Sequence, residues 1–61
     1  MKLGSYVIFR AKTGKYDFGK ITAIRNLIEK HTSKKYSNVD IVTILGEEHI
    51  EIPLKNIRTY D

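Results

Sequence analysis

The chain has 61 residues, of which 41% are hydrophobic and 30% are charged. A chain this short forms one small domain and excludes an enzyme built on a large parallel sheet. It contains no cysteine, which excludes disulfide bonds and cysteine-ligated zinc as supports for the core. No apolar run reaches the roughly 18 residues of a membrane span, and none of signal-peptide length follows Met1. We therefore expect a single cytoplasmic domain over residues 1–61, without membrane contact.

The net charge of +4 is unevenly distributed along the chain. Residues 1–35 hold nine Lys and Arg against two acidic residues, a balance of +7, whereas residues 36–61 hold two against five, a balance of −3. Such a concentration of positive charge is typical of a protein that meets a polyanion, because neutralising phosphates releases condensed counterions. A solvated lysine-rich face that only confers solubility is the alternative explanation.

In chain order, residues 5–11 are the first predicted strand, because apolar side chains alternate with a period of two. Residues 12–15 have the composition of a turn, in which Gly14 can take positive φ. Residues 18–24 then supply β-branched side chains for a second strand, and together these segments predict a hairpin. Gly19 marks a place where we expect a bulge or a close backbone approach.

The segment after Gly19 allows two interpretations. Ile21, Ile24, Ile28 and His31 recur at helical spacing, so a helix could run to about residue 33. We favour a strand that ends near residue 25, because a helix begun at Gly19 would lack a good cap and contain conformationally restricted residues. A single helical turn within residues 26–33 is compatible with both interpretations, and residues 26–38 are expected to form an elongated basic loop.

The second half of the chain predicts another hairpin. Residues 39–45 are rich in Val, Ile and Thr, as in a central strand, and residues 46–48 turn the chain into a strand at residues 49–52. Pro53 should end the pairing, after which residues 54–57 suit a 3₁₀ turn. The predicted core is Val7, Phe9, Ile21, Ile24, Val39, Ile41, Val42, Ile44, Leu45, Ile50, Ile52, Leu54 and Ile57.

Two segments resemble known small β-barrels. Residues 13–24 (TGKYDFGKITAI) are similar to the second strand of Tudor-type SH3-like barrels, and residues 44–58 (ILGEEHIEIPLKNIR) are similar to their closing half. Residues 7–21 more loosely resemble the KOW motif of SH3-like domains. The resemblance implies an all-β fold, a small SH3-like barrel of four to five antiparallel strands.

The branches of this family imply different ligands. In Tudor-like domains a cage of aromatic rings receives a methylated Lys or Arg. The matching rings here are Tyr16, Phe18 and Tyr36, and Asp17 or Glu47 would form an acidic wall of the cage. The Trp that is usual in the family is absent. KOW-like barrels meet nucleic acid or a polymerase-type partner through a basic face.

The favoured hypothesis is a non-enzymatic module that binds DNA or RNA. Cations that follow phosphates and rings that stack on bases are combined in single-strand-binding surfaces. Both kinds of side chain alternate in the basic half of the chain, and the candidate site is Lys12, Lys15, Tyr16, Phe18, Lys20, Arg25, Lys34, Lys35 and Tyr36. The alternative hypothesis is a protein-interaction adaptor that docks an acidic protein or an enzyme of nucleic-acid metabolism.

No catalytic or metal site is expected. His31 and His49 lie 18 residues apart without cysteine, and two imidazoles without fixed geometry do not hold zinc. The serines have no base at a recognised spacing, so no nucleophile stands out. The chain's ending loosely resembles the plasmid-borne trimethoprim-resistant dihydrofolate reductases, but their Val-Gln-Ile-Tyr pore motif is replaced here by residues 50–53 (IEIP). We therefore expect no enzyme activity and no cofactor.

Overall fold

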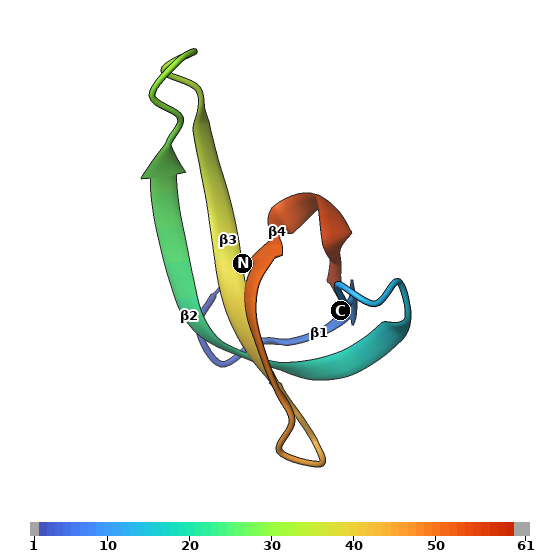
Figure 1. Cartoon of the computed structure of the whole chain (residues 1–61). Helices are drawn as coiled ribbons and strands as arrows, with labels where there is room; N and C mark the ends of the chain where they lie inside the picture. The colour runs from blue at the N-terminus through green and yellow to red at the C-terminus, as the bar shows by residue number, and fades with distance from the viewer. Residues whose placement is uncertain (1, 60–61) are drawn as a thin grey trace.

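The computed structural model describes residues 2–59, and their five strands form one antiparallel sheet (Figure 1). The strand order is β4-β3-β2-β1-β5, so each strand pairs with its sequence neighbour except β5, which returns to pair with β1. None of the described residues forms a helix long and apolar enough to cross a bilayer. The elements are β1 (Tyr6–Arg10), β2 (Tyr16–Ile28), β3 (Lys35–Thr43), β4 (Glu48–Pro53), the 3₁₀ turn η1 (Leu54–Asn56) and β5 (Ile57–Thr59).

The expected all-β class and both hairpins are confirmed, and so is the 3₁₀ turn after Pro53. No helix forms within residues 26–33, where one hydrogen bond from the Ser33 N–H to the Glu29 carbonyl oxygen closes a single turn. The loop expected over residues 26–38 is wrong. β2 continues as a strand to Ile28 and pairs there with Lys35, so that only residues 29–34 connect the two strands. Pairing with β3 decides the conformation of this segment against its helical spacing. The cross-strand hydrogen bonds give partners to backbone N–H and C=O groups that a single helical turn would leave without one.

The expected closed barrel is not present: the sheet stays open. β4 and β5 lie at opposite edges of the sheet, and no hydrogen-bonded register joins them within residues 2–59. Pro53 lacks an N–H and ends β4, after which η1 leads the chain across to β1. In Figure 1 the sheet curls strongly, and η1 arches over the space between the two edges.

The core lies on the inner side of the curled sheet. It is formed by Val7 and Phe9 of β1, Ile21 of β2, Val39 and Ile41 of β3 and Ile52 of β4, each no more than 1% exposed, with Ile57 packed against them. These residues occupy alternating strand positions that face one another across the sheet, as the period of two predicts.

Other predicted core residues are exposed. Ile44 and Leu45 do not extend β3 but form its turn into β4, where Gly46 has positive φ and Thr43 Oγ1 accepts the Glu47 N–H. Ile24, Ile50 and Leu54 are also exposed.

Gly19 is a place of close backbone approach, as expected. It is buried, and a Cβ built on it would lie 2.6 Å from the Val42 carbonyl oxygen and 2.6 Å from the Ile41 Cγ2 atom. The irregularity in the β2–β3 register occurs slightly later, between Ile21 and Ala23. A residue larger than glycine would therefore push β2 and β3 apart at the centre of the sheet.

Beyond this irregularity the β2–β3 hairpin projects from the sheet as an arm, defined here as residues 26–37. β1 pairs with β2 only as far as Lys20, and β4 pairs with β3 only from Asn38 onward, so no other strand of residues 2–59 pairs with the arm. Ser37 Oγ donates a hydrogen bond to Asn26 Oδ1 at its base, 2.8 Å long. Figure 1 shows the arm rising from the curled part of the sheet.

Candidate nucleic-acid interface

The outer side of the sheet can be assigned from the registers. Directly paired residues project to the same side of an antiparallel sheet, and Val7 and Phe9 face the inner core. The intervening residues of β1 and their partners therefore face outward. On β5, β1 and β2 these outer positions are Tyr6, Ile8, Arg10, Tyr16, Phe18, Lys20 and Arg58.

Aromatic rings gather on this outer side. Tyr6 and Phe18 stack with ring centroids 5.6 Å apart and planes 16° from parallel. Tyr16 lies two residues before Phe18 and is 58% exposed, and Tyr6 is 51% exposed. Rings that keep about half of their surface in contact with water on a sheet face are available to stack with a planar ligand.

Cations surround the rings. Arg58 places its guanidinium carbon 6.0 Å from the centroid of Tyr16, and Arg10 directly opposes Tyr16 in the register. Arg10 Nε donates to the Gly14 carbonyl oxygen over 3.3 Å, which tethers its side chain to the β1–β2 turn. Lys20 directly opposes Tyr6. We call the six residues Tyr6, Arg10, Tyr16, Phe18, Lys20 and Arg58 the outer cluster.

The structure divides the predicted site residues among three places. Tyr16, Phe18 and Lys20 come together in the outer cluster. Lys12 and Lys15 lie in the β1–β2 turn, where Lys12 lines a hollow with His49 and Lys15 lines a neighbouring one with Asp17. The remaining candidates lie on or near the arm and are Arg25, Lys34, Lys35 and Tyr36.

Arg25 has a structural partner. Its guanidinium lies 2.7 Å from Asp40 Oδ2, and Asp40 Oδ1 accepts the backbone N–H of Glu51 over 3.0 Å. The Glu51 N–H lowers the pKa of Asp40, as does Arg25, against the burial that raises it. Arg25 lies on β2 beside the arm, Asp40 on β3 and Glu51 on β4. The buried carboxylate of Asp40 therefore connects all three strands.

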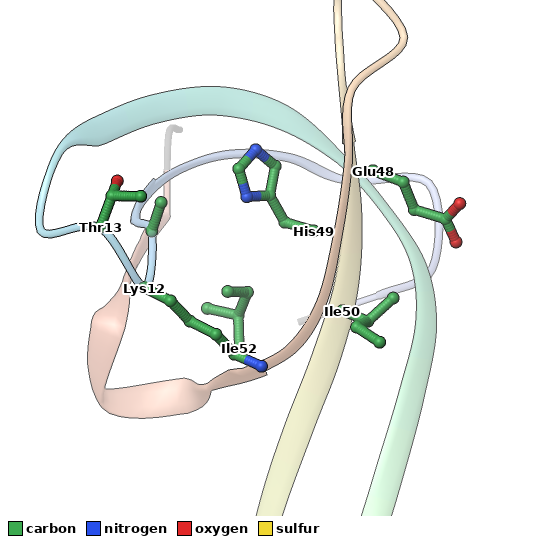
Figure 2. Close-up of a pocket in the computed structure, with 7 residues that line it drawn as sticks. Lys12, Thr13, Glu48, His49, Ile50 and Ile52 are labelled. Carbon is green, nitrogen blue, oxygen red and sulfur yellow. The ribbon is translucent and has the colours of Figure 1, made fainter.

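The inner side of the sheet has a hollow of different chemistry, shown in Figure 2. His49 and Ile52 point toward the turn that holds Lys12 and Thr13, whereas Glu48 points away on the other side of β4. The His49 ring packs edge-on against Phe9, with centroids 5.1 Å apart. The hollow is lined by both apolar and polar side chains, and it lies on the opposite side of the sheet from the outer cluster.

One cluster beside this hollow has the donor types of a metal site. Single ligand atoms of Asp17, Glu47 and His49 lie within 4.8 Å of one another. His49 Nε2 is 3.4 Å from Glu47 Oε1 without hydrogen-bond geometry, and it has no hydrogen-bond partner among the described residues. Both carboxylates are exposed and can be satisfied by water, so we assign no metal site to this cluster.

The aromatic cage implied by the Tudor resemblance is not assembled from the matching residues. Tyr36 pairs with Leu27 on the arm, far along β2 from Tyr16 and Phe18. Asp17 directly opposes Phe9, and it lines one hollow together with Tyr16 and Glu47. Tyr36 is therefore separated from the other cage positions, whereas both candidate wall residues lie beside Tyr16.

Tyr6, Arg10 and Arg58 were missed by the sequence reasoning. Arg58 follows η1 and reaches the cluster only because β5 pairs with β1. The alternation of residues 5–11 does place Tyr6 and Arg10 opposite the apolar face, which is the signal that could have identified them.

Comparison of the chain with models of protein families, with curated proteins and with solved structures finds no match.

Proposed function

We propose that the protein is a non-enzymatic module that binds nucleic acid through the outer cluster. The observation that supports this most strongly is the composition of one side of β5, β1 and β2. Its outer positions hold stacked or exposed rings and three cations, and none of these positions is acidic. Rings can stack on bases while cations neutralise phosphates, which is the combination that sequence-tolerant binding surfaces use.

The fold is consistent with this role. The strand order and the 3₁₀ turn before the last strand support an open variant of the SH3-like class. The acidic residues Glu47, Glu48 and Glu51 lie on β4 or its turn, on the other edge of the sheet from β5. Glu48 pairs with Val42, the partner of Lys20, so it faces the outer side two strands away from Lys20.

Binding to oligonucleotides at increasing salt tests the proposal. Fluorescence anisotropy with a mixed-sequence oligonucleotide should give an association constant whose logarithm falls linearly with the logarithm of salt concentration. The triple variant Arg10→Gln, Lys20→Gln, Arg58→Gln should bind more weakly. Its slope should be smaller by roughly 0.7 for each phosphate of a single strand that the variant no longer neutralises.

Lys12→Gln removes one charge from the turn beside the inner hollow, so it is the matched control for the single variants Arg10→Gln, Lys20→Gln and Arg58→Gln. It should leave the salt dependence of the association constant unchanged and weaken binding only slightly, through the loss of one positive charge. Absence of binding at low salt would exclude the proposal and favour the adaptor, an acidic protein being the partner that the same cations would attract. A drop in affinity for Lys12→Gln as large as for each outer-cluster cation would show that binding depends on net charge alone.

A further inference from the structure

The outer side of β2 continues from the outer cluster into the arm. The register with β3 shows which β2 residues share a side across the irregularity. Lys20 pairs with Val42 and Ala23 pairs with Asp40, and these alternate residues of β3 project to the same side. Arg25 and Leu27 alternate with Ala23, so they also lie on the side of Lys20. Figure 1 shows β2 as one long curved strand that joins the two regions. One continuous face of the sheet therefore links the cluster to the arm.

The far end of this face also holds a ring with cations beside it, together with one exposed carboxylate, Glu29. Tyr36 directly opposes Leu27, and their side chains are 46% and 37% exposed. Tyr36 and Lys34 line the same shallow hollow, which also includes Lys55 and Glu29. A ring with cations beside it thus occurs at both ends of the outer side of β2.

The face between the two ends presents no free carboxylate. Among the outer positions of β2 and β3, the acidic residue is Asp40, which is 6% exposed and bound by Arg25 and the Glu51 N–H. A phosphate chain laid along β2 would therefore pass Lys20 and the exposed part of Arg25 without meeting an exposed negative charge.

The length of this path sets the size of its ligand. Phe18 and Leu27 are nine residues apart on β2, which at about 3.3 Å per residue gives roughly 30 Å, compatible with the 37 Å long axis of the molecule. Nucleotides stacked at about 3.4 Å each would need roughly nine units to cover that distance.

We propose that the ligand is a single strand of roughly nine nucleotides that runs along β2 from the outer cluster to Tyr36. This inference rests on the proposed function. Single strands are favoured over duplexes because exposed rings at both ends need bare base faces, which a duplex keeps stacked inside. The competing occupant is a duplex whose major groove would receive the two-stranded arm.

Oligothymidylates of two lengths test the path by fluorescence anisotropy. A strand of about 12 nucleotides should bind at least about tenfold more tightly than one of about 4, because only the longer strand reaches the arm. Tyr36→Ala should weaken the longer strand by about tenfold and leave the shorter one unchanged. Ile28→Ala is the matched control, an exposed apolar truncation on the inner side of the same arm, and should change neither.

The outcomes separate this inference from the proposed function. If both lengths bind equally, or if Tyr36→Ala and Ile28→Ala behave alike, the path along the arm is wrong while binding at the cluster stands. If a duplex of equal length binds more tightly than the single strand, the arm enters a groove instead. If neither strand nor duplex binds at low salt, the proposed function itself fails. Circular dichroism of each variant verifies that the sheet is retained.

Discussion

The curled part of the sheet and the arm are built from the same two strands but differ in what covers them. Around Phe9 the inner side of β2 and β3 is buried under β1, β4 and Ile57, whereas along residues 26–37 no strand flanks the hairpin. Backbone pairing alone is sufficient to extend the strands, yet only the covered part contributes a core. The stability of the protein therefore resides in the curled part, and the arm is free to serve as a surface.

Among the variants that test this comparison, Phe9→Ala is expected to lower the free energy of unfolding the most. Phe9 is 0% exposed at the centre of the core, and such truncations cost about 3–5 kcal/mol, comparable with the whole stability of so small a domain. Thermal and urea unfolding followed by circular dichroism should show a largely unfolded variant at room temperature. A cooperative transition close to that of the wild type would mean that the curled part is not the stabilising region.

Gly19→Ala should have the next largest effect, because its methyl group would overlap the Val42 carbonyl oxygen. Overpacking of this kind costs about 1–3 kcal/mol. Gly46→Ala is the control with open space around the added methyl and strain only from its positive φ. Urea unfolding should rank Gly19→Ala as the more destabilising change, and the reverse order would place the close contact between β2 and β3 in doubt.

Asp40→Asn tests the junction between the two regions. Its lowered pKa means that the charged form stabilises the fold at pH above the ordinary value of 3.8, and that this contribution is lost as the pH falls below it. The variant should lose on the order of 1–2 kcal/mol at neutral pH, and its difference from the wild type should vanish in acid.

Glu29→Gln is the control for this titration, since Glu29 is exposed in the connection between β2 and β3. It should change the free energy of unfolding at neutral pH by no more than about 0.5 kcal/mol. If Asp40→Asn preserved the full acid dependence of the wild type, another carboxylate would be responsible for it.

Ile28→Ala should have the smallest effect on stability, within about 0.5 kcal/mol, because Ile28 is 63% exposed. Native-state hydrogen exchange sharpens the same comparison: amides of the arm should exchange well before those of β1. Equal protection in both regions would show that something covers the arm in solution.

The fold class could be predicted from the sequence because its signals are local. Alternation in residues 5–11, the β-branched run before residue 43 and the turn glycines each act within a few residues, and Gly14 and Gly46 have the positive φ that turns require. The arm could not be predicted, since Ile24 and Ile28 also have helical spacing and only pairing with residues 35–39 decides between the two.

The candidate site was predicted in part for a similar reason. Tyr16, Phe18 and Lys20 alternate on one strand, so their common side follows from the period of two. Arg58 joins them through the return of β5 to β1, a contact between residues far apart in the chain that no local pattern encodes. The separation of Tyr36 from Tyr16 likewise depends on the length of β2, which the structure extends to Ile28.

Backbone amide shifts during titration with a short oligothymidylate test the central claim most directly. We expect ¹H–¹⁵N shifts to concentrate at the outer positions of β1, β2 and β5, with Tyr6, Phe18 and Arg58 among the most affected. Residues that line the inner hollow away from Tyr16, such as Ile50 and Ile52, should stay unchanged. Shifts centred on that hollow, or none at low salt, would contradict binding at the outer cluster.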